Sequence, residues 1–182
     1  MVSNQAIIDH ILKSEGWPQY TNDPADKGGA TKGGITLETL SNWRGKTATE
    51  DDVRNLTESE AREIYEWKYI LIPKFDQIAD DLLRLQVVDA GVLSGPGRAI
   101  QWLQDCVGVT VDAALGPRTI NAVNVQPAHV VALKFAAARI VGLARIVTRD
   151  PSQAKWCLGW MNRATGFVTQ EAIRSTTSGG TA

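Results

Sequence analysis

The chain has 182 residues, which is enough to bury one large or two small hydrophobic cores without a stabilising metal ion or disulfide. Its hydrophobic fraction of 43% and charged fraction of 21% are those of a globular protein and exclude a disordered one. The net charge of -1 gives no reason to expect nucleic acid or an anionic membrane as a partner.

Metal and cofactor chemistry have little support in the sequence. Cys106 and Cys157 lie far apart and form no C-x-x-C pair, and His10 and His129 are the only histidines. The glycine-rich residues 26–36 lack the Gly-Lys-Ser/Thr order of a phosphate-binding loop at the required spacing, and no strand precedes them. We therefore predict no cofactor and no metal site.

Membrane and export signals are also not apparent. The first ten residues lack a basic region followed by an apolar stretch, so no signal peptide is predicted. The most apolar segment, residues 130–147, contains Lys134, Arg139 and Arg145 and does not predict a membrane span. Together with Arg149, these three basic residues are predicted to form a solvated helix edge. We expect synthesis in the cytoplasm.

The first predicted helix covers residues 3–15. Ile8, Ile11 and Leu12 recur at spacings of three and four, and Glu15 falls on the same face. A glycine directly after Glu15 is typical of a helix end. A glutamate is therefore placed in line with residues that are predicted to be buried.

Three further helices are predicted before the middle of the chain. Gly45 ends the first of them, Asp52 and Glu60 stand at the capping-box positions of the second and third, and Pro73 ends the third. Their predicted N-caps are Thr36, Thr49 and Thr57.

The second half is predicted to be helical almost throughout. Helices are expected in residues 95–108, 116–124, 127–149 and 150–166, with a proline at or near the start of each. The third of these is the longest and most apolar, which is typical of a core helix. The tail, residues 175–182, is predicted to be frayed.

The predicted fold class is mainly α, with one small polar hairpin or loop in residues 20–36. No Pro-, Gly- or Ser-rich linker divides the chain. A shift in composition between Asp89 and Gly97 nevertheless indicates a boundary. We predict two regions, residues 1–92 and 93–182, that pack on one another.

Glu15 is the first candidate for chemistry. A carboxyl group among apolar neighbours tends to keep its proton, because desolvation disfavours the charged form, and can then act as a general acid. A second carboxylate on a polar segment stays ionised, and glycoside hydrolases divide acid and base work in this way. Asp23 and Asp26 are both placed to be that partner. The alternative is that Glu15 reaches solvent and the aspartates only form turns.

The residues from Ser14 to Thr36 resemble the N-terminal signature of the family 108 glycoside hydrolases, the N-acetylmuramidases found among bacteriophage endolysins. That signature has Glu-Gly-Gly, a loop with Asn-Asp and Asp-x-Gly-Gly, and then Thr-x-x-Gly-Ile-Thr. This chain departs from it at Trp17, which stands at the second glycine. The matching residues are Glu15, Gly16, Asn22, Asp23, Asp26, Gly28, Gly29, Thr31, Gly34, Ile35 and Thr36.

Residues 97–123 are similar to the peptidoglycan-binding region that follows the muramidase region in this family. Ala113 stands where the family usually has glycine, so the turn there is expected to need a conformation that alanine can adopt. Gly159 to Arg163 also match the end of the family pattern. The matching residues are Leu103, Gln104, Gly108, Val109, Asp112, Gly116, Pro117 and Thr119.

This resemblance implies a lysozyme-like, mostly helical enzyme that hydrolyses the β-1,4 bond between N-acetylmuramic acid and N-acetylglucosamine. Glu15 would be the general acid. Asp26, or alternatively Asp23, would activate or orient a water that Thr31 helps to hold. Trp17, Tyr20 and Thr36 are the candidates for contacting the sugar. A direct attack by water would invert the anomeric centre, whereas a double displacement would retain it, and the sequence leaves both open.

The implied partner is the glycan strand of bacterial peptidoglycan, bound by a monomer. The implied setting is a phage-infected host, with synthesis in the host cytoplasm and action on the cell wall after release. Two other functions stay open: a murein-binding module without catalytic activity, and a lytic transglycosylase, which forms an anhydro sugar and needs no second carboxylate.

Overall fold

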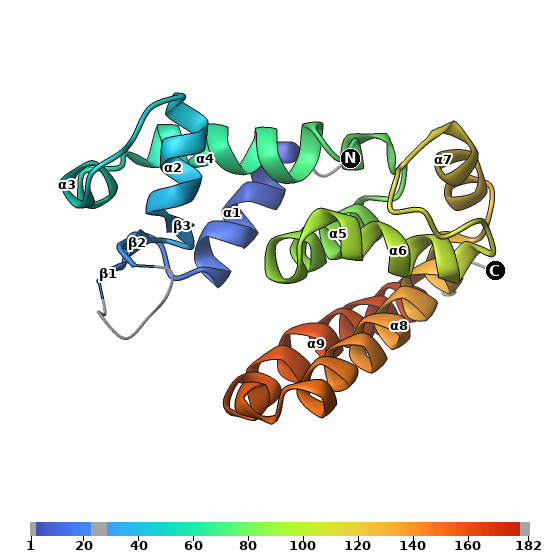
Figure 1. The fold of residues 1–182 in the computed structure, drawn as a ribbon. Helices are drawn as coiled ribbons and strands as arrows, with labels where there is room; N and C mark the ends of the chain where they lie inside the picture. Colours follow the sequence, from blue (N-terminus) through green and yellow to red (C-terminus); the bar gives the residue numbers. More distant parts are fainter. Residues whose placement is uncertain (1–2, 23–28, 179–182) are drawn as a thin grey trace. The chain divides into compact units, whose positions relative to one another are not determined.

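The computed structural model describes residues 3–22 and 29–178 (Figure 1). Its Cα packing forms two compact units, which divide between Ile72 and Pro73. We call them the N-terminal unit and the C-terminal unit and describe each by itself. Both are largely helical, which confirms the predicted mainly α fold class. The functional boundary predicted after residue 92 is a different division of the chain and stays a prediction.

The N-terminal unit consists of short helices and one small sheet. Its elements are α1 (Asn4–Ser14), β1 (Tyr20–Thr21), β2 (Thr31–Lys32), β3 (Ile35–Thr36), α2 (Leu37–Arg44), α3 (Glu50–Arg54), α4 (Glu58–Glu66) and a π-helical turn (Trp67–Leu71). Its core is aliphatic and includes Ile7, Ile8, Ile11, Leu12, Leu40, Val53, Leu56, Ala61 and Ile64. The apolar face predicted for the first helix is therefore buried.

Local side-chain caps begin these helices as predicted. Thr36 and Thr49 accept hydrogen bonds from the backbone N–H groups of Thr39 and Asp52, and Thr57 does the same for Glu60. Thr49 and Asp52 form a complete capping box. The carboxylate of Glu60, which was predicted to reach back to its own helix start, instead pairs with an arginine of α2.

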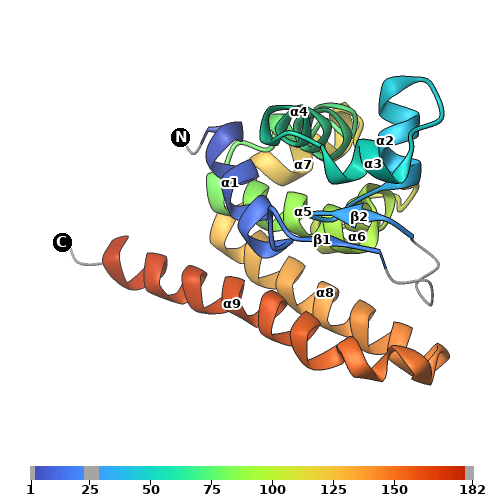
Figure 2. The same cartoon turned by 90° about the vertical axis from the view of Figure 1, so that its left-hand side faces the viewer.

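The sheet is antiparallel in the order β1-β2-β3. Thr31 pairs with Thr21 and Thr36, and Lys32 pairs with Tyr20 and Ile35. The hairpin predicted in residues 20–36 is thus present, as three two-residue strands. Figures 1 and 2 show this sheet beside the C-terminal end of α1.

The C-terminal unit is built on longer helices. They are a 3-10 turn (Phe75–Gln77), α5 (Asp81–Ser94), α6 (Pro96–Val107), α7 (Pro117–Asn124), α8 (Ala128–Arg149), a second 3-10 turn (Pro151–Gln153) and α9 (Ala154–Ser178). In both views α8 and α9 run side by side (Figures 1 and 2). The helix α9 continues to Ser178, so the prediction that the tail frays from residue 175 is wrong for its first four residues. None of the described helices is both long and apolar enough to span a membrane.

A buried group of charged residues joins three helices of this unit. Asp89 on α5 is 0% exposed and lies 2.7 Å from Arg139 on α8 and 2.7 Å from Arg163 on α9. Arg139 is also 0% exposed, so the prediction that it belongs to a solvated edge is wrong. Burial outweighs the attraction of Asp89 and lowers the pKa of Arg139. An internal ion pair therefore occupies part of the core.

Gln104 organises the turn before α7. Its side-chain amide donates to Asp112, Ala114 and Thr119, and its carbonyl oxygen accepts from the backbone N–H groups of Asp112 and Ala113. Gln104 is 1% exposed, so these contacts satisfy a buried amide. Ala113 has a φ of +62°, in the left-handed region that favours glycine, rather than a conformation that alanine adopts readily.

Candidate active site

Glu15 lies at the end of α1, where the helix is closed by a Schellman motif. The Trp17 N–H donates to Leu12 O at 2.9 Å and the Gly16 N–H donates to Lys13 O at 3.2 Å. Gly16 has a φ of +73°, in the left-handed region that favours glycine. The left-handed position of this motif is therefore occupied by a glycine. Trp17 takes the next position, where any side chain fits. The departure from Glu-Gly-Gly therefore leaves the turn intact.

The β2–β3 hairpin supplies the second part of the site. Its two-residue turn is Gly33-Gly34, with φ values of +51° and +77°. A type I′ turn needs a positive φ at both central positions, and its twist matches that of the flanking strands. The two glycines thus set a tight hairpin whose tip carries no side chains.

The carboxylate of Glu15 and the hydroxyl of Tyr65 meet at this turn. A Cβ atom on Gly34 would lie 2.9 Å from Glu15 Oε2 and 2.6 Å from the Tyr65 hydroxyl oxygen. The Tyr65 hydroxyl donates a hydrogen bond of 2.8 Å to the Gly33 carbonyl oxygen. Elements far apart in the sequence, namely the end of α1, the hairpin and α4, therefore converge on Glu15.

A second tyrosine extends this cluster. Tyr69, on the π-helical turn after α4, has its ring centroid 5.6 Å from that of Tyr65. Burial, and to a lesser degree the negative charge of Glu15, raises the pKa of Tyr69. The surroundings of Glu15 therefore include two aromatic rings with hydroxyl groups. Neither tyrosine was predicted as a site residue, because aromatic residues four apart on a helix are typical of packing.

The sheet separates the predicted site residues onto two faces. Neighbouring residues of a strand point to opposite sides, and cross-strand partners point to the same side. Thr31 and Thr36 therefore share one face, while Tyr20 and Lys32 share the other. Thr31 Oγ1 donates to Gly29 O at 3.1 Å. Thr36 is engaged as the N-cap of α2.

Tyr20 and Trp17, the predicted sugar-stacking residues, each lie against a cation. The guanidinium of Arg54 is 4.6 Å from the Tyr20 ring centroid, and the ammonium of Lys32 is 5.2 Å from that of Trp17. The Tyr20 hydroxyl is buried and has no hydrogen-bond partner among the described residues. A Cβ atom on Gly33 would lie 2.5 Å from Cε3 of Trp17, so this ring packs on the hairpin tip.

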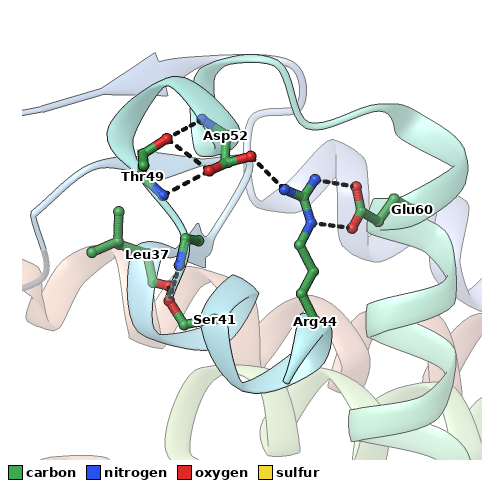
Figure 3. Close-up of polar contacts among 7 residues, drawn as sticks. Leu37, Ser41, Arg44, Thr49, Asp52 and Glu60 are labelled. Atoms are coloured by element: carbon green, nitrogen blue, oxygen red, sulfur yellow. Dashed lines mark hydrogen bonds and ion pairs between the residues drawn. The ribbon is translucent and has the colours of Figure 1, made fainter. Parts of the chain in front are cut away.

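An ionic network at the edge of the unit fixes the helices next to the hairpin (Figure 3). Arg44 on α2 donates with Nε and Nη2 to Glu60 on α4, both at 2.8 Å, and with Nη1 to Asp52 on α3 at 2.7 Å. Hydrogen bonds from Thr49, and then the Arg44 contact, lower the pKa of Asp52 to about 2. Ser41 links α2 to the same turn by accepting from the Ala48 N–H.

Asp23 and Asp26, the two candidate partners of Glu15, lie outside the described residues. The chain that carries them runs between β1 and β2. Asn22, directly before them, donates a hydrogen bond of 2.9 Å to Glu50 on α3. In the part of the chain that the structure describes, no three His, Cys, Asp or Glu side chains are grouped to hold a metal ion.

Two family models and a solved structure match this chain. The family Glycosyl hydrolase 108 matches residues 8–95, and the family Predicted Peptidoglycan domain matches residues 98–165. The solved structure of Brucella abortus SagA aligns with a TM-score of 0.80 and 29% sequence identity, over 93% of this chain and 94% of that chain. A search of curated proteins finds no match. The resemblance predicted from the sequence is confirmed.

Proposed function

We propose that this peptidoglycan-degrading glycosidase is an N-acetylmuramidase, because residues 8–95 match the glycosyl hydrolase 108 family and residues 98–165 match a peptidoglycan domain. The proposed bond is the β-1,4 bond between N-acetylmuramic acid and N-acetylglucosamine. The observation that carries the proposal is the position of Glu15, at the end of an apolar helix face and against the Gly33-Gly34 turn.

In the proposed mechanism Glu15 donates its proton to the glycosidic oxygen as the bond to the anomeric carbon breaks. The Glu15 carboxyl is half-buried and lies beside Tyr65 at the hairpin. We propose Asp26 as the base that activates water, with Asp23 as the alternative and Thr31 as a residue that orients this water. Asp23 precedes a proline in an Asn-Asp-Pro turn and suits a structural role, so Asp26→Asn should lower turnover more than Asp23→Asn.

The product of digestion tests the proposed specificity. Purified peptidoglycan is digested, the new reducing ends are reduced with borohydride, and the fragments are identified by mass spectrometry. A muramidase gives reduced N-acetylmuramic acid at each new end. Reduced N-acetylglucosamine would identify a glucosaminidase instead. Anhydro-muramic acid would identify a lytic transglycosylase, because hydrolysis adds a water to the product and transglycosylation does not.

The biological setting is a separate part of the proposal. We propose that the protein is a bacteriophage endolysin that acts as a monomer after release from the host cytoplasm. Expressed in a Gram-negative host, it should leave cells intact until the inner membrane is permeabilised and then lyse them within minutes. Lysis without permeabilisation would contradict this route. Sedimentation of the purified protein tests the oligomeric state.

A further inference from the structure

The C-terminal unit has a hollow of about 230 Å³ between α6 and α8. We call it the arginine hollow, because three of its lining residues are arginines. It lies wholly within this unit. The lining residues are Arg98, Gln101 and Trp102 from α6 and Gly142, Arg145, Ile146 and Arg149 from α8.

The arginines of this hollow differ from most others in the protein. Arg98, Arg145 and Arg149 form no ion pair with any carboxylate of the described residues, and the same holds for Arg118 on α7. Seven other arginines do form such pairs: Arg44, Arg54, Arg62, Arg84, Arg139, Arg163 and Arg174. Three of the four unpaired guanidinium groups are thus gathered around one hollow.

Two of the three arginines follow one another along α8. Arg145 and Arg149 are one helical turn apart on α8, and like charges at this spacing repel one another. An anion bound in the hollow would remove this repulsion.

The apolar wall of the hollow is fixed in place. Gly142 on α8 allows Trp102 to lie on the helix backbone, since a Cβ atom there would be 2.4 Å from Cζ2 and 2.6 Å from Nε1 of the indole. Phe135 makes an edge contact with the same indole ring, with centroids 6.5 Å apart. The hollow therefore combines a rigid indole face with three cationic side chains.

We propose that the arginine hollow binds the carboxylate groups of the peptide stems of peptidoglycan, an inference that rests on the proposed function. In assembled peptidoglycan the lactyl carboxyl of N-acetylmuramic acid is amide-linked to its stem, so the negative charges reside on the stems. Guanidinium groups bind carboxylates in bidentate pairs, and Trp102 offers a surface to the aliphatic parts of the stem.

The test measures binding separately from cutting. The full-length Glu15→Gln variant is titrated with a soluble muramyl peptide whose carboxylates are free, and with the same compound after amidation. We expect Arg145→Gln combined with Arg149→Gln to weaken binding of the free form by on the order of 10-fold or more. Amidation should weaken binding to the unmodified hollow by a similar factor. Arg118→Gln is the matched control and should bind as the parent does.

Three results would overturn the inference. They are equal binding of the free and amidated compounds, equal loss in the Arg118→Gln control, and displacement of the muramyl peptide by duplex DNA or by anionic vesicles at low concentration. Circular dichroism and thermal melts of each variant separate weaker binding from misfolding. If digestion of peptidoglycan fails while the muramyl peptide still binds, the proposed bond specificity fails and the arginine hollow stands.

Discussion

Arg44 in the N-terminal unit and Arg139 in the C-terminal unit both pair with carboxylates, but in different surroundings. Arg44 is 24% exposed and its partner Glu60 is 23% exposed, and the hydrogen bonds that Arg44 donates to Glu60 contribute most to raising the pKa of Arg44. Arg139 and Asp89 are both 0% exposed, and burial lowers the pKa of Arg139. The edge pair has water as an alternative partner, whereas the buried pair has none. Removing one member should therefore matter far more in the C-terminal unit.

The backbone of the two units differs in a second way. Around the candidate active site each described left-handed position is a glycine, including Gly16, Gly33 and Gly34. The C-terminal unit has a glycine, Gly108, in this conformation but also Lys74 and Ala113. The hairpin tip and the end of α1 thus adopt their shapes without strain, while the turn before α7 contains a residue that disfavours its own φ. The backbone geometry near Glu15 is therefore better matched to its residue types than the backbone geometry of the turn before α7.

Glu15→Gln should have the largest effect, because it removes the proton that the proposed mechanism transfers while it preserves size. Turnover should fall by about 10²- to 10⁴-fold, with the thermal melt unchanged. Turbidity loss of a peptidoglycan suspension measures it. Glu63→Gln, at an exposed position of α4, is the control and should keep full activity. A Glu15→Gln variant that retains a tenth of the turnover would remove this residue from the acid role.

Asp89→Asn tests the buried side of the comparison. It leaves the guanidinium of Arg139 buried without its counter-charge, so unfolding should become easier by about 3–5 kcal/mol. Glu60→Gln breaks the edge pair with Arg44 and should cost about 1 kcal/mol or less. Denaturant titration followed by tryptophan fluorescence compares the two variants, since each unit contains three tryptophans. Similar losses in the two variants would contradict the distinction between the units.

Gly34→Ala tests whether the hairpin tip positions Glu15. The new Cβ would collide with the Tyr65 hydroxyl and with Glu15 Oε2, so turnover should fall on the order of 10²-fold. Stability should fall as well, by about 1–2 kcal/mol, because alanine disfavours a positive φ. Gly45→Ala, with a φ of +65° and no atom within 4 Å of the new Cβ, shares only this backbone cost. If both variants lose activity equally, the collision at Glu15 is not the cause.

The sequence predicted those parts of the fold that depend on near neighbours. Three threonine N-caps, the stop at Gly16 and the proline helix starts need only residues within a turn of one another, and each is present. The helix α5 was missed as a helix, although Asp80 caps it by accepting from the Leu83 N–H. Asp89 and Gly91 interrupt the apolar run of this helix. From the sequence alone, this change in composition was interpreted as a boundary between two regions of the chain. The partners that make Asp89 acceptable there are Arg139 on α8 and Arg163 on α9, and Arg163 is 74 residues away.

In the candidate site, too, the sequence predicted only what depends on residues that are close together in the chain. Glu15 could be found from its place on an apolar face, because that argument is local. Tyr65 could not, since its contact with Gly33 spans 32 residues and depends on how the hairpin folds over α1 and α4. Arg139 was assigned to a solvated edge because its helix neighbours include other basic residues, and only the tertiary position of Asp89 shows otherwise. Long-range pairs are thus the part that sequence patterns leave out.

Ala113→Gly should have the smallest effect and the opposite sign. Ala113 has a φ of +62°, a conformation that costs alanine about 1–2 kcal/mol relative to right-handed backbone and that glycine adopts freely. Glycine also gains entropy in the unfolded chain, which offsets part of the benefit, so a net stabilisation of about 1 kcal/mol is expected. For a chain of this length that is an increase of about 2–4 °C in the melting temperature of the C-terminal unit. Ala114→Gly, at a neighbouring position without a positive φ, should lower the melting temperature instead.

A lower melting temperature in Ala113→Gly as well would contradict this prediction. The turn that Gln104 organises would then hold Ala113 without measurable strain, and the difference in residue type between this turn and the glycines around Glu15 would not correspond to a difference in stability.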